Sequence, residues 1–225
     1  RYLNLVSSSR VDFVPVLLGA VLLWDFFSRV MSGVTMAFFE DVWSRNFLNI
    51  FATPISIVEY VGGLVLSSIC TSTIGLMVML VMAVFLFGLS FLTYGIWIVP
   101  FLLVLFLFGI ALGIVGSGIV LRLGPASEWF VWPIPAVVAP FAGVYYPVST
   151  LPRWMQYIAR ALPPSYVFEG LRGIIAGRGA SAASLAGGAG LAVGYVVLAG
   201  WFFTRMYRHA VRTGLIARYS AETVS

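Results

Sequence analysis

The chain consists of long apolar runs separated by short polar segments. A helix needs roughly 20 apolar residues to cross the hydrocarbon layer of a membrane. The pattern predicts membrane-spanning helices at about 14–38, 60–87, 96–121, 130–148 and 183–204. Five spans would place the two termini on opposite sides of the membrane.

The fourth of these runs contains four prolines, namely Pro133, Pro135, Pro140 and Pro147. Proline has no backbone N–H and clashes with the preceding helical turn, so this helix must be kinked or broken. A bilayer tolerates such a break where protein or a cavity satisfies the freed backbone groups.

Composition indicates an integral membrane protein. The 225 residues are 61% apolar and 9% charged, whereas soluble domains carry about 25% charged residues. This difference excludes a soluble globular domain, a disordered segment and a nucleic-acid-binding segment. We therefore predict an all-α membrane protein in which residues 1–225 form a single polytopic helical bundle.

Charge leaves the orientation of the bundle open. All 13 basic residues are Arg, and their scatter is typical of membrane edges rather than of a basic patch for nucleic acid. With the N-terminus outside, inner and outer segments hold six Arg each, although the cluster in the C-terminal tail favours a cytoplasmic C-terminus. The polar start without Met leads us to expect that an N-terminal piece of the natural protein is missing.

Two polar interruptions carry further information. In residues 40–57, apolar residues recur among polar ones at spacings close to the 3.6 residues of a helical turn, and Pro54 ends the pattern. This spacing predicts a short amphipathic helix on the membrane surface. This helix is either a plain interfacial connector or a docking element for a soluble partner.

The second interruption, residues 147–178, predicts two helices over 153–161 and about 165–176. Neither is long enough to span, so we expect a helical hairpin that dips part-way into one leaflet. Glu169 and Arg172, three residues apart, can pair on one face.

The order of these segments along the chain resembles that of a known family. The order is a span, the acidic "FFED", a short helix ending "ATPIS", two spans, and then "YYPVSTLPRWMQYIARALPPSYVFEGLRG" before a final span. This order is similar to that of the membrane subunit, or permease, of type-2 ABC transporters of the bacterial exporter class. The likeness covers about residues 14–212. Family members usually have six spans and a cytoplasmic N-terminus, so the first span would be missing here.

The resemblance implies a role for each interruption. Segment 41–53 would be the coupling helix, seated in a groove of a separate ABC ATPase subunit, and the candidate contact residues are Glu40, Asp41, Arg45, Phe47, Leu48, Phe51, Thr53 and Pro54. Hairpin 150–178 would be a re-entrant gate on the outer side, with candidate residues Pro152, Trp154, Tyr157, Pro163, Pro164, Glu169 and Arg172. Residues 39–58, 122–129 and 205–225 would then be cytoplasmic.

The resemblance also implies how the protein is powered. These 225 residues hold no Walker motif and no Lys, so ATP and Mg²⁺ would bind in the partner ATPase, with no cofactor in this chain. The permease would work as a homo- or heterodimer in the bacterial inner membrane and export a drug, lipid or polysaccharide. The alternatives are an integral-membrane lipid-modifying enzyme and a non-transporting assembly subunit.

Individual residues allow two readings each. Asp25 and Arg29 lie four apart in the first span, where each charge would cost roughly 2.5–3.5 kcal/mol, so they form either a structural pair or part of a polar translocation path. Gly109, Gly113 and Ser117 give a face of small residues for packing within the subunit or at a dimer seam.

The lone Cys70 and lone His209 cannot build a metal or nucleophile site, so we predict no catalytic or metal-binding residues.

Overall fold

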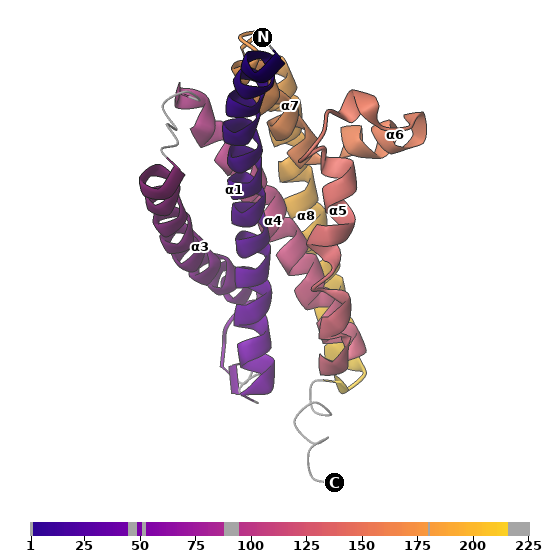
Figure 1. The fold of residues 1–225 in the computed structure, drawn as a ribbon. Helices are drawn as coiled ribbons and strands as arrows, with labels where there is room; N and C mark the ends of the chain where they lie inside the picture. Colours follow the sequence, from indigo (N-terminus) through magenta and orange to yellow (C-terminus); the bar gives the residue numbers. More distant parts are fainter. Residues whose placement is uncertain (1, 45–48, 51–52, 88–94, 180, 216–225) are drawn as a thin grey trace. The chain divides into compact units, whose positions relative to one another are not determined.

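The computed structural model describes residues 2–44, 49–50, 53–87, 95–179 and 181–215 (Figure 1). Regular structure in these ranges is helical throughout, which confirms the all-α prediction. The elements are α1 (Tyr2–Trp43), α3 (Ile57–Phe87), α4 (Ile98–Leu123), η2 (Pro125–Phe130), α5 (Ile134–Ala142), η3 (Val148–Thr150), α6 (Arg153–Ala161), α7 (Pro163–Ile175) and α8 (Ala182–Arg212).

Within these ranges, four helical stretches are long and apolar enough to cross a membrane, namely Gly19–Trp43, Ile57–Phe85, Gly95–Leu123 and Ala182–Arg212. They correspond to four of the five predicted spans. Several helices extend beyond the apolar runs that predicted them. For example, α8 continues from Arg205 to Arg212, and α1 already begins at Tyr2. Hydropathy marks the part of a helix that suits hydrocarbon, whereas backbone hydrogen bonds continue into the polar flanks.

The run predicted as a span over 130–148 is not one regular helix. It contains the end of η2, the nine-residue α5 and the start of η3. Nine residues extend only about 14 Å, which is too short to cross the hydrocarbon layer as a single helix. The break occurs where the prolines predict it, because α5 has Pro140 inside it and ends two residues later, before Gly143 at φ 66°.

The chain divides into two compact units. One comprises Arg1–Phe27, Gly75–Phe106 and Ala136–Ala192, and the other comprises Ser28–Ile74, Leu107–Pro135 and Val193–Ser225. The boundaries fall inside the long helices, so each unit receives part of α1, α3, α4 and α8. We call them the hairpin unit, which contains α6 and α7, and the junction unit, which contains the end of α1 and the start of α3.

Close helix packing in the junction unit depends on small residues. A Cβ atom on Gly113 of α4 would lie 2.9 Å from the Met31 carbonyl oxygen of α1, so only glycine permits this approach. Ser117 is fully buried and donates a hydrogen bond to the Gly113 carbonyl oxygen at 3.0 Å. The Gly113–Ser117 face therefore packs within the chain, which was the first of its two predicted readings. Phe38 and Phe203 meet edge to face nearby, with ring centroids 6.2 Å apart.

The hairpin unit is organised around α7. Val167, Phe168 and Leu171 are buried, and the Phe168 ring lies 6.2 Å from that of Trp24 in α1. Gly170 provides a close approach to α4, because a Cβ atom there would lie 2.9 Å from the Phe101 ring. Helix α6 runs across the direction of α5 (Figure 1).

Candidate functional site

The end of α1 forms the entrance to the predicted coupling segment. The Ser44 amide donates to the Glu40 carbonyl oxygen at 2.9 Å, which continues the helical pattern to the end of α1. Glu40 and Asp41 therefore lie in the last turn of α1. The predicted helix over 41–53 is wrong at its start, because residues 41–43 belong to the preceding span.

The rest of that segment is only partly described. Arg45, Phe47, Leu48 and Phe51 lie outside the described residues, so their predicted contacts stay predictions. Thr53 and Pro54 are exposed in a turn, where the Thr53 hydroxyl donates a hydrogen bond to the Ile50 carbonyl oxygen.

A hydrogen bond joins the end of α1 to the start of α3. The Tyr60 hydroxyl donates to Asp41 Oδ2 at 2.8 Å, between residues 19 positions apart. Tyr60 is buried, and Asp41 is half-buried. A charged acceptor makes this bond stronger than one between neutral groups. The two helices on either side of the predicted coupling segment are thus tied directly to each other.

The start of α3 has its own cap. The Ser56 amide and hydroxyl both donate to Glu59 Oε2 at 2.8 Å, and the Glu59 amide donates back to Ser56 Oγ at 3.3 Å. This reciprocal arrangement is a capping box, which satisfies backbone donors that the first helical turn leaves free. The pattern Ser-x-x-Glu before an apolar run could have identified this box from the sequence.

A second contact holds α1 against α3 at positions farther from the predicted coupling segment in both helices. Ser68 is fully buried and donates to the Val30 carbonyl oxygen at 2.8 Å. A Cβ atom on Gly33 would lie 2.8 Å from Ser68 Oγ. The absence of a side chain at Gly33 therefore brings the helices close enough for this bond.

A groove of about 350 Å³ with both polar and apolar lining runs beside that contact. Its polar lining comes from both helices and comprises Arg29, Ser32 and Glu40 of α1 and Ser67, Thr71 and Ser72 of α3. Ser72 Oγ is buried without a hydrogen-bond partner among the described residues. Arg29 is exposed in the groove, whereas Asp25 is half-buried. Their predicted pairing stays a prediction.

The hairpin has the two helices that the sequence predicts. Helix α6 begins after Pro152, and α7 begins at Pro163, two residues before its predicted start. Proline is favoured in the first helical turn, where its missing N–H has no partner to lose, so the Pro163–Pro164 pair starts α7. The buried Ser165 hydroxyl closes the corner, because it lies 2.6 Å from the Ala159 carbonyl oxygen and 2.8 Å from that of Leu162.

Two aromatic gate candidates lie on the exposed side of α6. The Trp154 side chain is exposed, and its ring meets Phe141 edge to face at 6.3 Å. Tyr157 is also exposed, with the Arg160 guanidinium 5.9 Å from its ring centroid. Exposed Trp and Tyr rings suit the membrane–water interface.

Glu169 connects α7 to the preceding loop. Its Oε1 accepts hydrogen bonds from Arg172 Nη2 at 3.0 Å and from the Val148 amide at 2.7 Å. The predicted Glu169–Arg172 pair is therefore confirmed, and the contact to Val148 adds a partner that local spacing could not reveal. Arg172 Nη1 also reaches the Val144 carbonyl oxygen at 3.5 Å. The Glu169–Arg172 ion pair thus binds the backbone of the loop before α6 at Val144 and Val148, and holds it against α7.

Comparison with protein families identifies a match. The sequence profile described as ABC-2 type transporter matches residues 2–176. This range runs from α1 to the end of α7 and includes both the junction of α1 with α3 and the hairpin. No curated protein matches the chain.

Proposed function

The chain belongs to the ABC-2 type transporter family, and from this premise we propose that it is the membrane half of an exporter for a drug, lipid or polysaccharide. Family membership and the spanning helices make it a permease and a multi-pass integral membrane protein. Permeases of this family work with an ABC ATPase partner. In the proposed complex, two permease copies in the bacterial inner membrane bind two ATPase subunits, which hold ATP and Mg²⁺.

The observation that carries the proposal is the double attachment of the predicted coupling segment. Its first end continues from α1 and its second end leads into the capped start of α3, and the Asp41–Tyr60 bond links the two helices. A push on this segment would therefore act on two spanning helices at once. Closure of the ATPase subunits on ATP supplies such a push in the proposed mechanism.

The groove between α1 and α3 supports a transport role. Hydroxyl groups and an Arg are costly in spanning helices unless they face protein or a polar cavity. Here they line one groove of about 350 Å³. The lipid-modifying enzyme and the assembly subunit remain the alternatives that the following experiment separates from export.

The experiment is co-purification of the permease with a candidate ATPase subunit that carries a Walker motif. Wild type should yield a complex that hydrolyses ATP. Phe47→Asp/Phe51→Asp should lose the ATPase, because two charges would enter the apolar face proposed to contact it.

Tyr157→Asp/Ile158→Asp provides the matched control, since it places two Asp side chains on the exposed part of α6. This control should retain the ATPase. If wild type binds no ATPase, or if both double variants bind it equally well, the coupling assignment fails and the two alternatives move ahead.

A further inference from the structure

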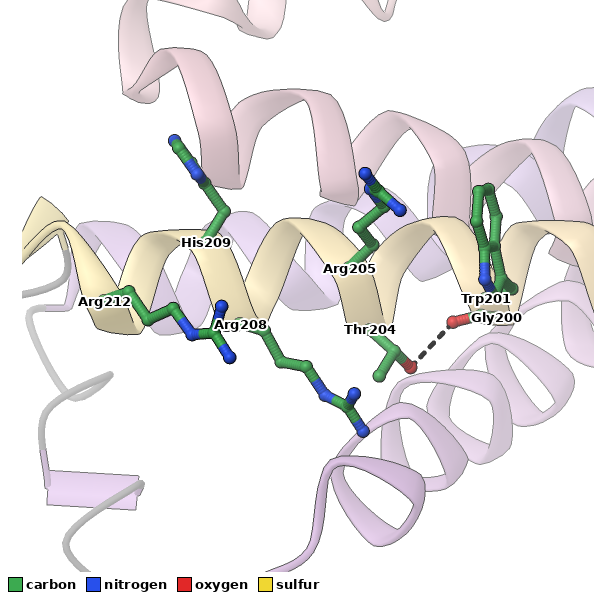
Figure 2. Close-up of a pocket in the computed structure, with 7 residues that line it drawn as sticks. All are labelled: Gly200, Trp201, Thr204, Arg205, Arg208, His209 and Arg212. Atoms are coloured by element: carbon green, nitrogen blue, oxygen red, sulfur yellow. Dashed lines mark hydrogen bonds between the residues drawn. The ribbon is translucent and has the colours of Figure 1, made fainter.

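The last turns of α8 carry a cluster of cations around an open hollow. Arg205, Arg208, His209 and Arg212 line a hollow of about 560 Å³ together with Trp201 (Figure 2). All four basic side chains are exposed. Thr204 also lines the hollow, but its hydroxyl donates back to the Gly200 carbonyl oxygen at 2.8 Å, as the dashed line in Figure 2 shows. The hollow is therefore dominated by positive charge.

The three Arg side chains share one face of the helix with Trp201. Positions 201, 205, 208 and 212 follow each other at spacings of four, three and four residues, which keeps them on one side of an α-helix. The opposite side is buried and consists of Ala199, Phe203, Met206 and Ala210. The cationic face is thus the side of α8 that the core of the junction unit leaves uncovered.

These charges have no anionic partner in the part of the chain that the structure describes. Helix α8 contains no acidic residue. Arg205 makes a cation–π contact with an aromatic ring of the same helix, because its guanidinium lies 5.7 Å from the Trp201 ring centroid. The helix dipole favours cations in the last turn, but Arg205 lies seven residues before Arg212. Helix capping therefore does not account for the whole cluster.

An exposed apolar stripe leads directly into the cluster. Val193 is 52% exposed, Val197 66% and Trp201 61%, and the three lie at spacings of four residues. This stripe belongs to a helix that is long and apolar enough to span a membrane. Tryptophan prefers the depth at which hydrocarbon gives way to polar headgroups, so Trp201 marks the boundary between the stripe and the cations.

We propose that this face of α8 binds an anionic phospholipid, with an acyl chain along Val193, Val197 and Trp201 and the phosphate group held by Arg205, Arg208 and Arg212. Arginine pairs with phosphate through two parallel hydrogen bonds, and clusters of Arg next to a spanning helix attract anionic headgroups. His209 lines the same hollow. The inference does not depend on the proposed export function.

A lipid fits this face better than an acidic protein does. A soluble partner would meet the cations, but it would leave the adjoining apolar stripe unused inside the membrane. A phospholipid has an anionic head and apolar chains in the order that the helix presents. An acidic partner, including the ATPase, is accordingly treated as a competing outcome of the test.

The test measures lipid binding to the purified permease in detergent, with phosphatidylglycerol, phosphatidylcholine and inorganic phosphate as separate probes. Native mass spectrometry counts the bound lipids. Arg205→Gln/Arg208→Gln/Arg212→Gln removes the cluster. Arg153→Gln/Arg160→Gln/Arg178→Gln removes the same number of exposed charges elsewhere, including Arg160, which also lies over an aromatic ring. The melting temperature of each variant in phosphatidylcholine confirms that it is folded.

Each Arg near an anionic surface contributes about 1 kcal/mol, which is roughly a fivefold change in affinity. We therefore expect the cluster variant to bind phosphatidylglycerol at least tenfold more weakly, and the control variant to differ less than twofold from wild type. Phosphatidylcholine binding should be the same in all three proteins. Inorganic phosphate at millimolar concentration should not displace the lipid.

Three results would overturn the proposal. Equal loss of phosphatidylglycerol in both variants would show that general charge, and not this cluster, attracts the lipid. Displacement by inorganic phosphate would identify a site for the free ion. Unchanged lipid binding together with weaker co-purification of the ATPase in the cluster variant would assign the surface to an acidic protein partner.

Discussion

The hairpin and the junction of α1 with α3 hold their helices in different ways. In the hairpin, the side chains of Ser165, Glu169 and Arg172 bond to backbone groups at several points of the α6–α7 corner and of the loop before it. At the junction, separate hydrogen bonds between described residues join the helices, from Tyr60 to Asp41 and from Ser68 to the Val30 carbonyl oxygen. The two acceptors on α1, Asp41 and Val30, are about three helical turns apart.

This difference indicates which region can move. Several bonds that converge on one ion pair must break together before the hairpin changes shape. Each junction bond can break alone, because each joins a separate pair of turns. We infer that the hairpin acts as a rigid part and the junction as an adjustable one, which suits a gate and a coupling element.

Removal of the Glu169 carboxylate should have the largest effect on stability. Glu169→Ala removes the acceptor of Val148 and leaves Arg172 without its ion-pair partner. Two such bonds to a charged group would contribute about 3–6 kcal/mol together if they were buried. The exposure of this carboxylate reduces the total to roughly 2 kcal/mol. The unfolding midpoint of the purified permease, followed by tryptophan fluorescence, should fall accordingly.

Glu169→Gln is the matched control for this variant. Its amide oxygen can still accept a hydrogen bond from the Val148 amide, so it should lose roughly half as much stability. An unchanged midpoint in Glu169→Ala would contradict the rigid hairpin.

A methyl group at Gly33 should have the next largest effect. Its Cβ atom would lie 2.8 Å from Ser68 Oγ, so α1 and α3 must separate or Ser68 must turn and lose its bond to Val30. Overpacking of this kind costs about 1–2 kcal/mol. Gly62→Ala in α3 tests the same substitution in open space and should be neutral or raise stability by up to about 1 kcal/mol. Equal midpoints for both variants would show that α1 and α3 are not held together at Gly33.

Loss of the Tyr60 hydroxyl should have a smaller effect on stability and a clear effect on coupling. Tyr60→Phe removes one hydrogen bond to the half-buried Asp41 carboxylate, which is worth about 1 kcal/mol once solvent screening of the charge is allowed for. The complex with the ATPase should still form, but the permease should no longer alter the rate of ATP hydrolysis. The control is Tyr195→Phe, which preserves the edge-to-face contact with Phe108 and should behave as wild type. Normal coupling in Tyr60→Phe would remove the junction bond from the mechanism.

The smallest effect should come from the cap of α3. Ser56→Ala breaks the capping box, which costs about 0.5–1 kcal/mol and should mainly loosen the first turn. Hydrogen exchange should become faster at the amides of residues 57–60. Ser181→Ala removes the corresponding contact to the Ser184 amide at the start of α8, so its exchange should increase only there. Faster exchange at both sites in either variant would indicate global destabilisation.

Sequence patterns predicted the features that depend on local spacing. Apolar runs located four spanning helices, prolines located the break near α5, and the spacing of Glu169 and Arg172 predicted their ion pair. Each of these depends on residues within a few positions of each other. Helix ends were less accurate, since hydropathy does not report where backbone hydrogen bonding stops.

The junction could not be predicted in the same way. Tyr60 and Asp41 are 19 positions apart, and Ser68 and Val30 are 38 apart. Their contacts arise only after α1 and α3 have packed, and a Tyr or Ser inside an apolar run gives no local indication of its partner. The resemblance to a known family indicated the coupling segment but not the bonds that attach it.

The most direct test of the account compares two exposed tryptophans. Trp43 ends α1 beside the coupling segment and is 51% exposed, whereas Trp154 lies in the hairpin and is 59% exposed. A photo-crosslinking phenylalanine derivative is placed at each position in turn, in the complex of permease and ATPase. The account predicts that position 43 crosslinks to the ATPase and position 154 does not. Crosslinking from position 154 but not from position 43 would contradict both the coupling assignment and the orientation of the protein in the membrane.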